Sequence, residues 1–207
     1  MALMTKTSPY YIPLFISVVC LVLFAIEISG IGFDAGNVLA YRYDGVSQYE
    51  LWRLFSGNFL HTNFWHLLMN LGGLWVIIFL HEMHYKHHPG KLILLISVLS
   101  LIQGVGLYYL FPETKGFVGL SGMLHGLFAF GAIMDVRKGF RSGYMLLIGV
   151  IVKVMYEQYF GAPEDMSTLI GARVSIESHF IGLFSGVIIG LFWLTQANRF
   201  KYKPVKK

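Results

Sequence analysis

A serine and a histidine that could act together as nucleophile and base lie in separate apolar segments. Ser121 occurs in Gly-Leu-Ser-Gly and His179 in Ser-His-Phe-Ile-Gly. A serine hydroxyl is a weak nucleophile until a neighbouring imidazole removes its proton. Polar side chains are costly inside a bilayer, so two that can meet there indicate a functional site. The pair predicts acyl-transfer chemistry within a membrane.

The composition predicts an all-α polytopic membrane protein. Of the 207 residues, 56% are apolar and 13% charged, and the mean hydropathy is +0.62. Soluble proteins average about 25% charged residues. The single cysteine, Cys20, has no partner for an intramolecular disulfide and is expected to pack as a small apolar residue. We expect one membrane domain over residues 1–207.

Six segments are apolar enough to span a bilayer, which takes about 20 residues each. The first lacks a small-residue cleavage site and is expected to be a retained helix, not a secretory signal. The predicted spans are 11–29, 62–81, 91–111, 118–136, 142–160 and 174–196.

Lysine and arginine accumulate in cytoplasmic loops, so their distribution predicts orientation. Eleven fall in the amino terminus, the second and fourth loops and the tail, against four in the other loops, and Lys153 lies inside the fifth helix. Both termini are therefore expected in the cytoplasm. The net charge of +5 reflects this topology, with attraction to anionic lipid near the basic tail Lys201–Lys207, and gives no support for nucleic-acid binding.

This topology brings the second, fourth and sixth helices into the membrane from the outer face. Ser121 then lies three residues into its segment and His179 about five, roughly 5–8 Å below the helix starts at about 1.5 Å per residue. His66 and Asn70 share one face of the second helix through their i, i+4 spacing. These two side chains and the Ser121 backbone N–H are candidate donors to the oxyanion of a tetrahedral intermediate.

Small residues allow helix backbones to approach closely, and here they recur beside both reactive residues. Ordinary tight helix packing is the alternative explanation of such repeats. The glycines are Gly119, Gly122 and Gly126 around Ser121, and Gly182, Gly186 and Gly190 after His179.

These motifs in this order resemble the rhomboid intramembrane serine proteases over nearly the whole chain. The resemblance rests on Trp52-Arg53, His61, the run His66-Leu-Leu-Met-Asn70, Gly119-Leu-Ser121-Gly122, and Ser178-His179-Phe-Ile-Gly182 with Gly186.

The resemblance implies a six-helix rhomboid core that needs no cofactor. Ser121 would be the nucleophile and His179 the general base, a dyad without an aspartate, with His66 and Asn70 at the oxyanion. Water would arrive through a cavity on the outer side, and membrane-anchored protein substrates would enter laterally beside the fifth helix. The implied location is the bacterial inner membrane, with the site open to the periplasmic side.

Two departures from the common family pattern are similar to a subgroup, the rhombosortases. His125 occupies a position where many rhomboids have tyrosine, and Ser178 replaces the usual alanine before the base. Gly-Leu-Ser-Gly-x-Leu-His-Gly and the pair Glu157-Gln158 late in the fifth helix match that subgroup. Its implied substrates are secreted proteins with a carboxy-terminal Gly-Gly, a hydrophobic helix and a basic tail.

Several roles remain open at this point. Glu157 could pair with Lys153 at i, i+4 spacing, or Glu157 and Gln158 could bind the substrate backbone. His125 could pack on His179 or contact substrate. Structural roles are expected for the interfacial residues Trp52, Arg53 and His61.

No metal site is expected. The histidines around His81-Glu-Met-His84 lack the His-Glu-x-x-His spacing of zinc proteases and fall at a cytoplasmic helix end. We expect a solvated interfacial loop there, which also contains His87 and His88.

The main alternative function is a catalytically inactive rhomboid-like protein that binds or escorts transmembrane helices. Such proteins commonly lack the serine or the histidine, and this chain has both. A transporter ranks third because neither inverted repeats nor broken helices are evident.

Overall fold

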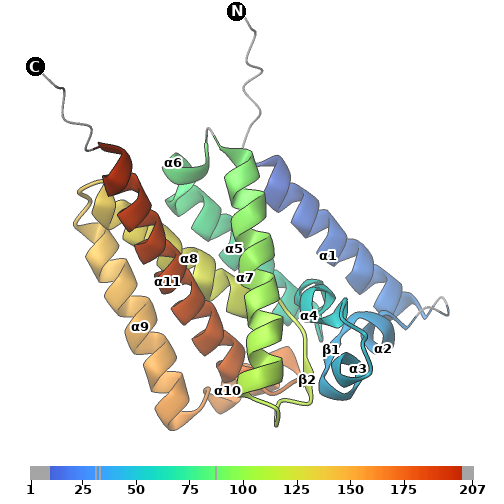
Figure 1. Cartoon of the computed structure of the whole chain (residues 1–207). Helices are drawn as coiled ribbons and strands as arrows, with labels where there is room; N and C mark the ends of the chain where they lie inside the picture. Colours follow the sequence, from blue (N-terminus) through green and yellow to red (C-terminus); the bar gives the residue numbers. More distant parts are fainter. Residues whose placement is uncertain (1–9, 31, 33, 87, 202–207) are drawn as a thin grey trace, which may run out of the picture.

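Six long helices dominate the computed structural model, which describes residues 10–30, 32, 34–86 and 88–201 (Figure 1). Lys6, His87 and the tail beyond residue 201 lie outside the described residues. The long helices are α1 (Tyr11–Ser29), α5 (Phe64–Leu80), α7 (Pro89–Leu110), α8 (Ser121–Arg137), α9 (Ser142–Phe160) and α11 (Ile176–Lys201). The short elements are α2 (Ala35–Leu39), β1 (Tyr41–Arg42), α3 (Tyr43–Ser47), α4 (Arg53–Ser56), η1 (Gly57–Phe59), α6 (Glu82–Tyr85), β2 (Gly116–Phe117) and α10 (Glu164–Ile170).

The lipid-facing character of the bundle is evident from its surface. Large apolar side chains such as Phe15 and Met145 are 68% and 76% exposed. Three helices within the described residues are long and apolar enough to cross a membrane: α1, α7 and residues 176–195 of α11. Two bent pairs, α4–η1 with α5 and α9 with α10, raise this number to as many as five. The chain is therefore a membrane-embedded, multi-pass protein, while the count of six spans stays a prediction.

Helix α8 lies at the centre of the bundle and is packed by α5, α7, α9 and α11 (Figure 1). Most of its side chains are buried, including Met123, Leu127 and Ala132 at 0% exposure. Six of its 17 residues are glycine, alanine or serine, which allows neighbouring helices to approach closely.

The crossing of α8 and α11 depends on glycine. A Cβ on Gly126 would lie 2.7 Å from the Gly182 carbonyl oxygen, and Cβ atoms on Gly182 and Gly186 would overlap the carbonyls of Gly122 and Gly126. Backbone atoms cannot yield as a flexible side chain can. The glycine pattern thus holds the two backbones in direct contact, one helix carrying Ser121 and the other His179.

We expect Gly182→Ala to destabilise the protein by about 1–3 kcal/mol, the usual cost of overpacking. Gly72→Ala is the matched control, because nothing lies within 4 Å of the Cβ that it would add to α5. Thermal unfolding of both variants in one detergent checks the prediction. Equal melting temperatures for the two variants would contradict a close backbone crossing at Gly182.

The segment between α1 and α5 is tied to the entrance of α8. Strand β1 pairs antiparallel with β2, with Tyr41 opposite Phe117 and Arg42 opposite Gly116. Figure 1 shows this pair and α10 at one end of the bundle and α6 at the other.

Arg53 and Trp52 have partners inside this first segment. The buried Arg53 donates from Nη1 to the Ala40 carbonyl at 2.8 Å and from Nε to Glu50 at 2.5 Å. The Trp52 indole donates to the Val38 carbonyl at 3.0 Å. These contacts fit the structural roles predicted for both residues, since they hold loop carbonyls rather than face a cavity.

Candidate active site

Ser121 is the first residue of α8, whereas the sequence placed it three residues inside a helix starting at 118. Gly119 has φ +112°, outside the helical range, and its N–H donates to the Gly57 carbonyl at 3.0 Å. The helix can therefore begin only after it. The N-cap residue of α8, Leu120, makes no side-chain hydrogen bond to the helix, and the first N–H groups of a helix have no intrahelical partner. Ser121, the candidate nucleophile, therefore lies beside backbone N–H groups that have no partner within the helix.

His179 lies in the first turn of α11 and meets Ser121 directly. Its Nε2 is 3.0 Å from the Ser121 hydroxyl oxygen. The imidazole is only 5% exposed. The predicted meeting of these two side chains is present in the structure, at a distance suited to a hydrogen bond.

Glu157 extends this pair to a third residue. Its Oε2 lies 2.8 Å from His179 Nδ1. A carboxylate accepts, so Nδ1 carries the proton and Nε2 presents its lone pair to the Ser121 hydroxyl. The expectation of a two-residue arrangement was incomplete. Glu157 lies three residues before the end of α9, so the depth count applied to Ser121 and His179 would have found it.

Lys153 and His125 close a ring of hydrogen bonds that returns to Ser121. Lys153 Nζ lies 2.8 Å from both Glu157 Oε2 and His125 Nε2. His125 Nδ1 lies 2.7 Å from the Ser121 carbonyl, which can only accept. His125 therefore has its proton on Nδ1 and accepts from Lys153 at Nε2. Both tautomers follow from fixed acceptors.

The expected pairing of Lys153 with Glu157 is present, but the ammonium group also contacts His125 Nε2 and lies 3.2 Å from His179 Nδ1. His125 also stacks on His179, with ring centroids 4.2 Å apart and planes at 23°. Of the two roles left open for His125, the packing against the imidazole is present, and His125 also lines the larger cavity described below, so its contact with substrate stays a prediction.

His66 and Asn70 flank Ser121 from α5. The side chain of Asn63 caps this helix by accepting from the His66 N–H at 2.9 Å. Asn70 Nδ2 donates to the His66 carbonyl at 2.9 Å, and Asn70 Oδ1 is buried without a partner in the described part of the chain. His66 Nδ1 lies 3.0 Å from the Thr62 hydroxyl.

His61 packs edge-on against His66, with ring centroids 5.1 Å apart. His61 is 6% exposed. A buried His61 that contacts a site residue fits its predicted structural role.

Gln158 is not brought into the site. Its Nε2 donates to the Ile176 carbonyl at 2.8 Å, which joins α9 to the start of α11. It lines neither of the two cavities described below. The substrate contact predicted for Gln158 therefore has no support in this arrangement.

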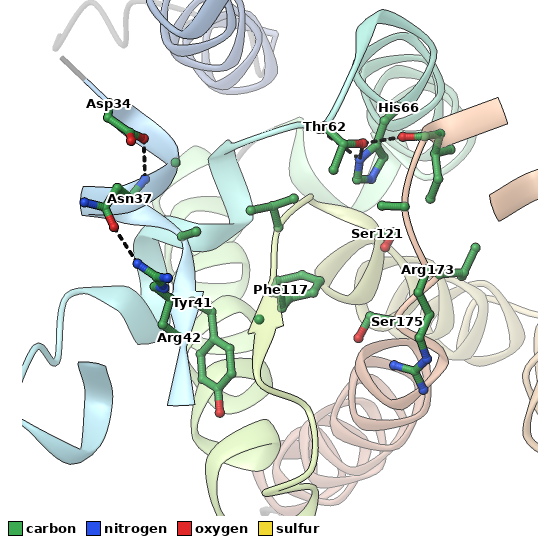
Figure 2. A pocket seen from close by; sticks show the side chains of 17 residues that line it. Asp34, Asn37, Tyr41, Arg42, Thr62, His66, Phe117, Ser121, Arg173 and Ser175 are labelled. Carbon is green, nitrogen blue, oxygen red and sulfur yellow. Dashed lines mark hydrogen bonds between the residues drawn. The ribbon is translucent and has the colours of Figure 1, made fainter. Parts of the chain in front are cut away.

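Two cavities meet at Ser121 and His66. One, of about 770 Å³, is largely apolar and lies between α5, α8, α9 and α10, with Met69, Phe128 and Val152 among its lining. The other, of about 590 Å³, lies by the β1–β2 pair and includes polar side chains from separate elements (Figure 2). Those shown include Asn37, Arg42, Thr62, Arg173 and Ser175.

His125, Glu157 and His179 are near enough to one another to hold a metal ion, with one ligand atom from each within 4.8 Å. Lys153 already brings a positive charge to this point, 2.8 Å from the Glu157 and His125 acceptors. An ammonium group there competes with a cation, so the cluster is better suited to proton transfer than to metal binding.

The fold and this site together define a membrane-embedded protein with the side-chain arrangement of a serine hydrolase. The Rhomboid domain family matches residues 48–196. Because this match covers well over half of the chain, the chain belongs to the rhomboid family.

Curated relatives agree with this assignment. Rhomboid protease GlpG of Salmonella choleraesuis (strain SC-B67) is 30% identical over 185 residues, covering 85% of this chain and 59% of the relative. Rhomboid protease GlpG of Salmonella newport (strain SL254) is 29% identical over 161 residues, covering 74% of this chain and 51% of the relative. The chain thus spans between half and three-fifths of the length of these relatives.

Proposed function

We propose that this rhomboid-family protein is an intramembrane serine endopeptidase that cleaves membrane-anchored proteins. The alignment of Ser121, His179 and Glu157 carries the proposal. Its two hydrogen bonds of 3.0 and 2.8 Å give the serine a base and the base an orienting carboxylate. The same arrangement of a nucleophile, a base and a third group that orients the base recurs in unrelated serine hydrolases.

In the proposed reaction, the Ser121 hydroxyl oxygen attacks the carbonyl carbon of the scissile peptide bond. His179 Nε2 takes the hydroxyl proton and then gives it to the leaving amine as the C–N bond breaks. A water molecule, deprotonated by the same nitrogen, hydrolyses the ester and releases the new carboxyl group. Glu157 holds Nδ1 in its donor state and stabilises the imidazolium that forms transiently.

Donors for the oxyanion are available on two elements. The Ser121 backbone N–H lies at the uncapped start of α8, where the helix dipole also favours negative charge. Asn70 and His66 approach from α5 and line the apolar cavity with Ser121. We propose that these groups stabilise the tetrahedral intermediate, with Asn70 turning its amide from the His66 carbonyl to the substrate.

We propose that substrate and water reach Ser121 through different cavities. The apolar cavity between α5 and α9 suits an extended transmembrane segment that enters laterally beside α9. The cavity by β1 and β2 has polar side chains that suit water. Both include Ser121, so the nucleophile lies where the two routes meet.

We propose that all six long helices cross the bacterial inner membrane as one domain, with both termini in the cytoplasm. The distribution of basic residues, eleven against four, supports this orientation. Ser121, α10 and the polar cavity then face the periplasmic side.

The finer proposal is a rhombosortase role. The residues Gly119 to Gly126 and the pair Glu157-Gln158 carry that likeness, and Glu157 contacts the base directly. A Gly-Gly pair at the start of a substrate's anchor would unwind easily, because glycine is a poor helix former. An unwound peptide bond could extend into the cavity and reach Ser121.

A fluorophosphonate probe, which labels activated serines and needs no known substrate, tests the core of the proposal. We expect purified protein in detergent to be labelled, with the adduct mapped to Ser121 by mass spectrometry of its peptides. His179→Ala should reduce labelling to background while keeping its melting temperature. A folded wild-type protein that stays unlabelled would favour a helix-binding protein without catalysis.

A reporter with a carboxy-terminal Gly-Gly, hydrophobic helix and basic tail tests the finer proposal. We expect its cleavage near the glycines in cells that produce the protein, and loss of cleavage when Gly-Gly is replaced by Val-Val. Equal cleavage of both reporters would overturn the proposed preference for Gly-Gly. The protein would then be a rhomboid protease without that preference.

A further inference from the structure

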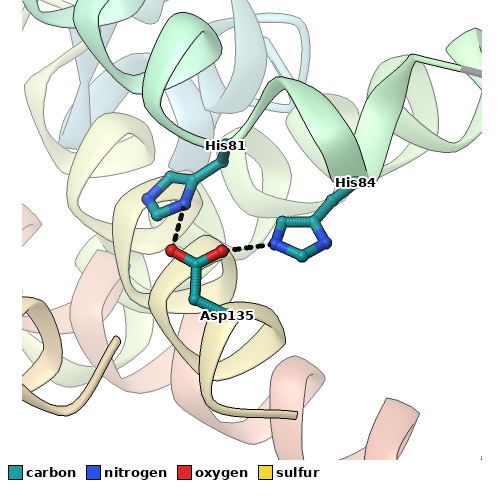
Figure 3. Close-up of side chains that lie close together, drawn as sticks. All are labelled: His81, His84 and Asp135. Carbon is teal, nitrogen blue, oxygen red and sulfur yellow. Dashed lines mark hydrogen bonds and ion pairs between the residues drawn. The ribbon is translucent and has the colours of Figure 1, made fainter. Parts of the chain in front are cut away.

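A second cluster of potential ligands lies at the opposite end of the molecule from Ser121. His81 follows α5, His84 is in α6, and Asp135 is near the end of α8 (Figure 3). Asp135 follows Ser121 by 14 residues on one helix, a separation of about 21 Å along its axis. The cluster is therefore separate from the proposed proteolytic site.

Both imidazole rings point to the same carboxylate (Figure 3). His84 Nε2 lies 2.6 Å from Asp135 Oδ1, and His81 Nδ1 lies 3.1 Å from Asp135 Oδ2. One ligand atom from each residue lies within 4.8 Å of the others. In a tetrahedral zinc site, neighbouring ligand atoms are about 3.3 Å apart. A small adjustment of the three side chains would therefore place their ligand atoms around one ion.

His81 lacks the hydrogen bonds that a buried imidazole normally has. It is 0% exposed, and neither ring nitrogen has a hydrogen-bond partner among the described residues. The 3.1 Å approach of Nδ1 to Asp135 is thus not a well-directed hydrogen bond. Buried polar groups without partners are rare because they lose their hydration. Coordination through Nδ1 would satisfy one of these two nitrogens.

Asp135 pairs with no lysine or arginine among the described residues. It is 6% exposed, and in the described part of the chain its only ion-pair partners are His81 and His84. A buried carboxylate needs a compensating positive charge. A divalent cation would supply that charge while using the lone pairs of two neutral imidazoles.

We propose that His81, His84 and Asp135 bind a divalent transition-metal ion, with Zn²⁺ the best fit. Two imidazole nitrogens and one carboxylate oxygen suit zinc better than calcium or magnesium, which prefer oxygen ligands. Water would occupy the fourth position. The ion would join the α5–α6 junction to the central helix α8.

Metal content and Co²⁺ spectroscopy test the site on untagged, full-length protein in detergent. After chelator treatment and removal of the chelator, we expect one equivalent of Co²⁺ to bind and to give visible absorption bands typical of nitrogen and oxygen ligands. Zn²⁺ should displace it. Asp135→Asn and His84→Gln should each weaken binding by more than about 100-fold, beyond the loss typical of outer-shell changes.

Two histidine controls locate the ion. His88→Ala removes an exposed histidine from the neighbouring α7 cap, and His125→Ala removes one from the proposed catalytic ring. Both should keep the Co²⁺ spectrum. Melting temperatures show which variants are folded, and folded His84→Gln suffices if Asp135→Asn fails to fold. Absence of binding by wild type, retention of binding by folded His84→Gln, or its loss in His125→Ala would overturn the proposal.

Discussion

Ser121→Ala is expected to lower cleavage and fluorophosphonate labelling by at least about 10³-fold, because it removes the oxygen that forms the covalent intermediate. The change removes one atom at the start of α8 and no packing volume of note. The melting temperature should therefore stay close to that of the wild type. Labelling of the purified variant, and reporter cleavage in cells, measure the effect.

Ser185→Ala is the matched control for this substitution. Ser185 is buried, and among the described residues its hydroxyl donates only to the Gly182 carbonyl within α11, at 2.8 Å. We expect this variant to be labelled and to cleave like wild type. Undiminished labelling of Ser121→Ala would show that another residue is the nucleophile.

Glu157→Gln is expected to lower the turnover rate by about 10²–10⁴-fold, with little change in KM. A glutamine amide can donate to Nδ1, which would leave the proton on Nε2 and prevent that nitrogen from accepting the Ser121 proton. A comparable loss follows when the acidic residue of a serine-protease triad becomes an amide. Steady-state kinetics on a cleavable reporter separate the two parameters.

The kinetics also decide between the two roles considered for Glu157. If Glu157 gripped the substrate backbone, its substitution would raise KM and leave turnover nearly unchanged. Glu113→Gln, which removes an exposed carboxylate from the segment before β2, is the control for lost charge and should behave as wild type. A folded Glu157→Gln protein with full turnover would exclude Glu157 as the positioning residue for His179.

Hydropathy located five of the six long helices closely, whereas α11 ends at residue 201, five residues beyond its predicted span of 174–196. Helices α1 and α9 coincide with the segments predicted at 11–29 and 142–160, and α5 and α7 begin and end within about two residues of theirs. The start of α8 differs because the positive φ of Gly119 ends the preceding turn. A window of apolar residues cannot detect a single backbone angle.

Hydropathy did not predict the short helices and strands. The β1–β2 pair joins residues 41 and 117, and the Thr62 hydroxyl donates to the carbonyl of Ile170, the last residue of α10. Each contact joins segments far apart in the chain. Local pattern alone does not specify such pairings.

The prediction for the histidines after α5 was wrong. We expected a solvated interfacial loop, but His81 is 0% exposed and the His84 side chain 7%. The end of α8 carries Asp135 to both rings, and α6 turns the second histidine toward the same carboxylate. His88 is exposed, as expected.

The sequence by itself determined how far each polar residue lies from the end of its apolar segment, because hydropathy marks those segments. The similar depths of Ser121 and His179 below the ends of their helices were enough to suggest that the two side chains meet. The same count places Glu157 at a similar depth. Only the tertiary structure decided how each helix is rotated about its axis and which helices are neighbours. Those two properties point Glu157 at the imidazole and Gln158 at a backbone carbonyl, although the residues are adjacent in sequence. The rotation of α9 depends on its packing against α8 and α11, which no single segment encodes.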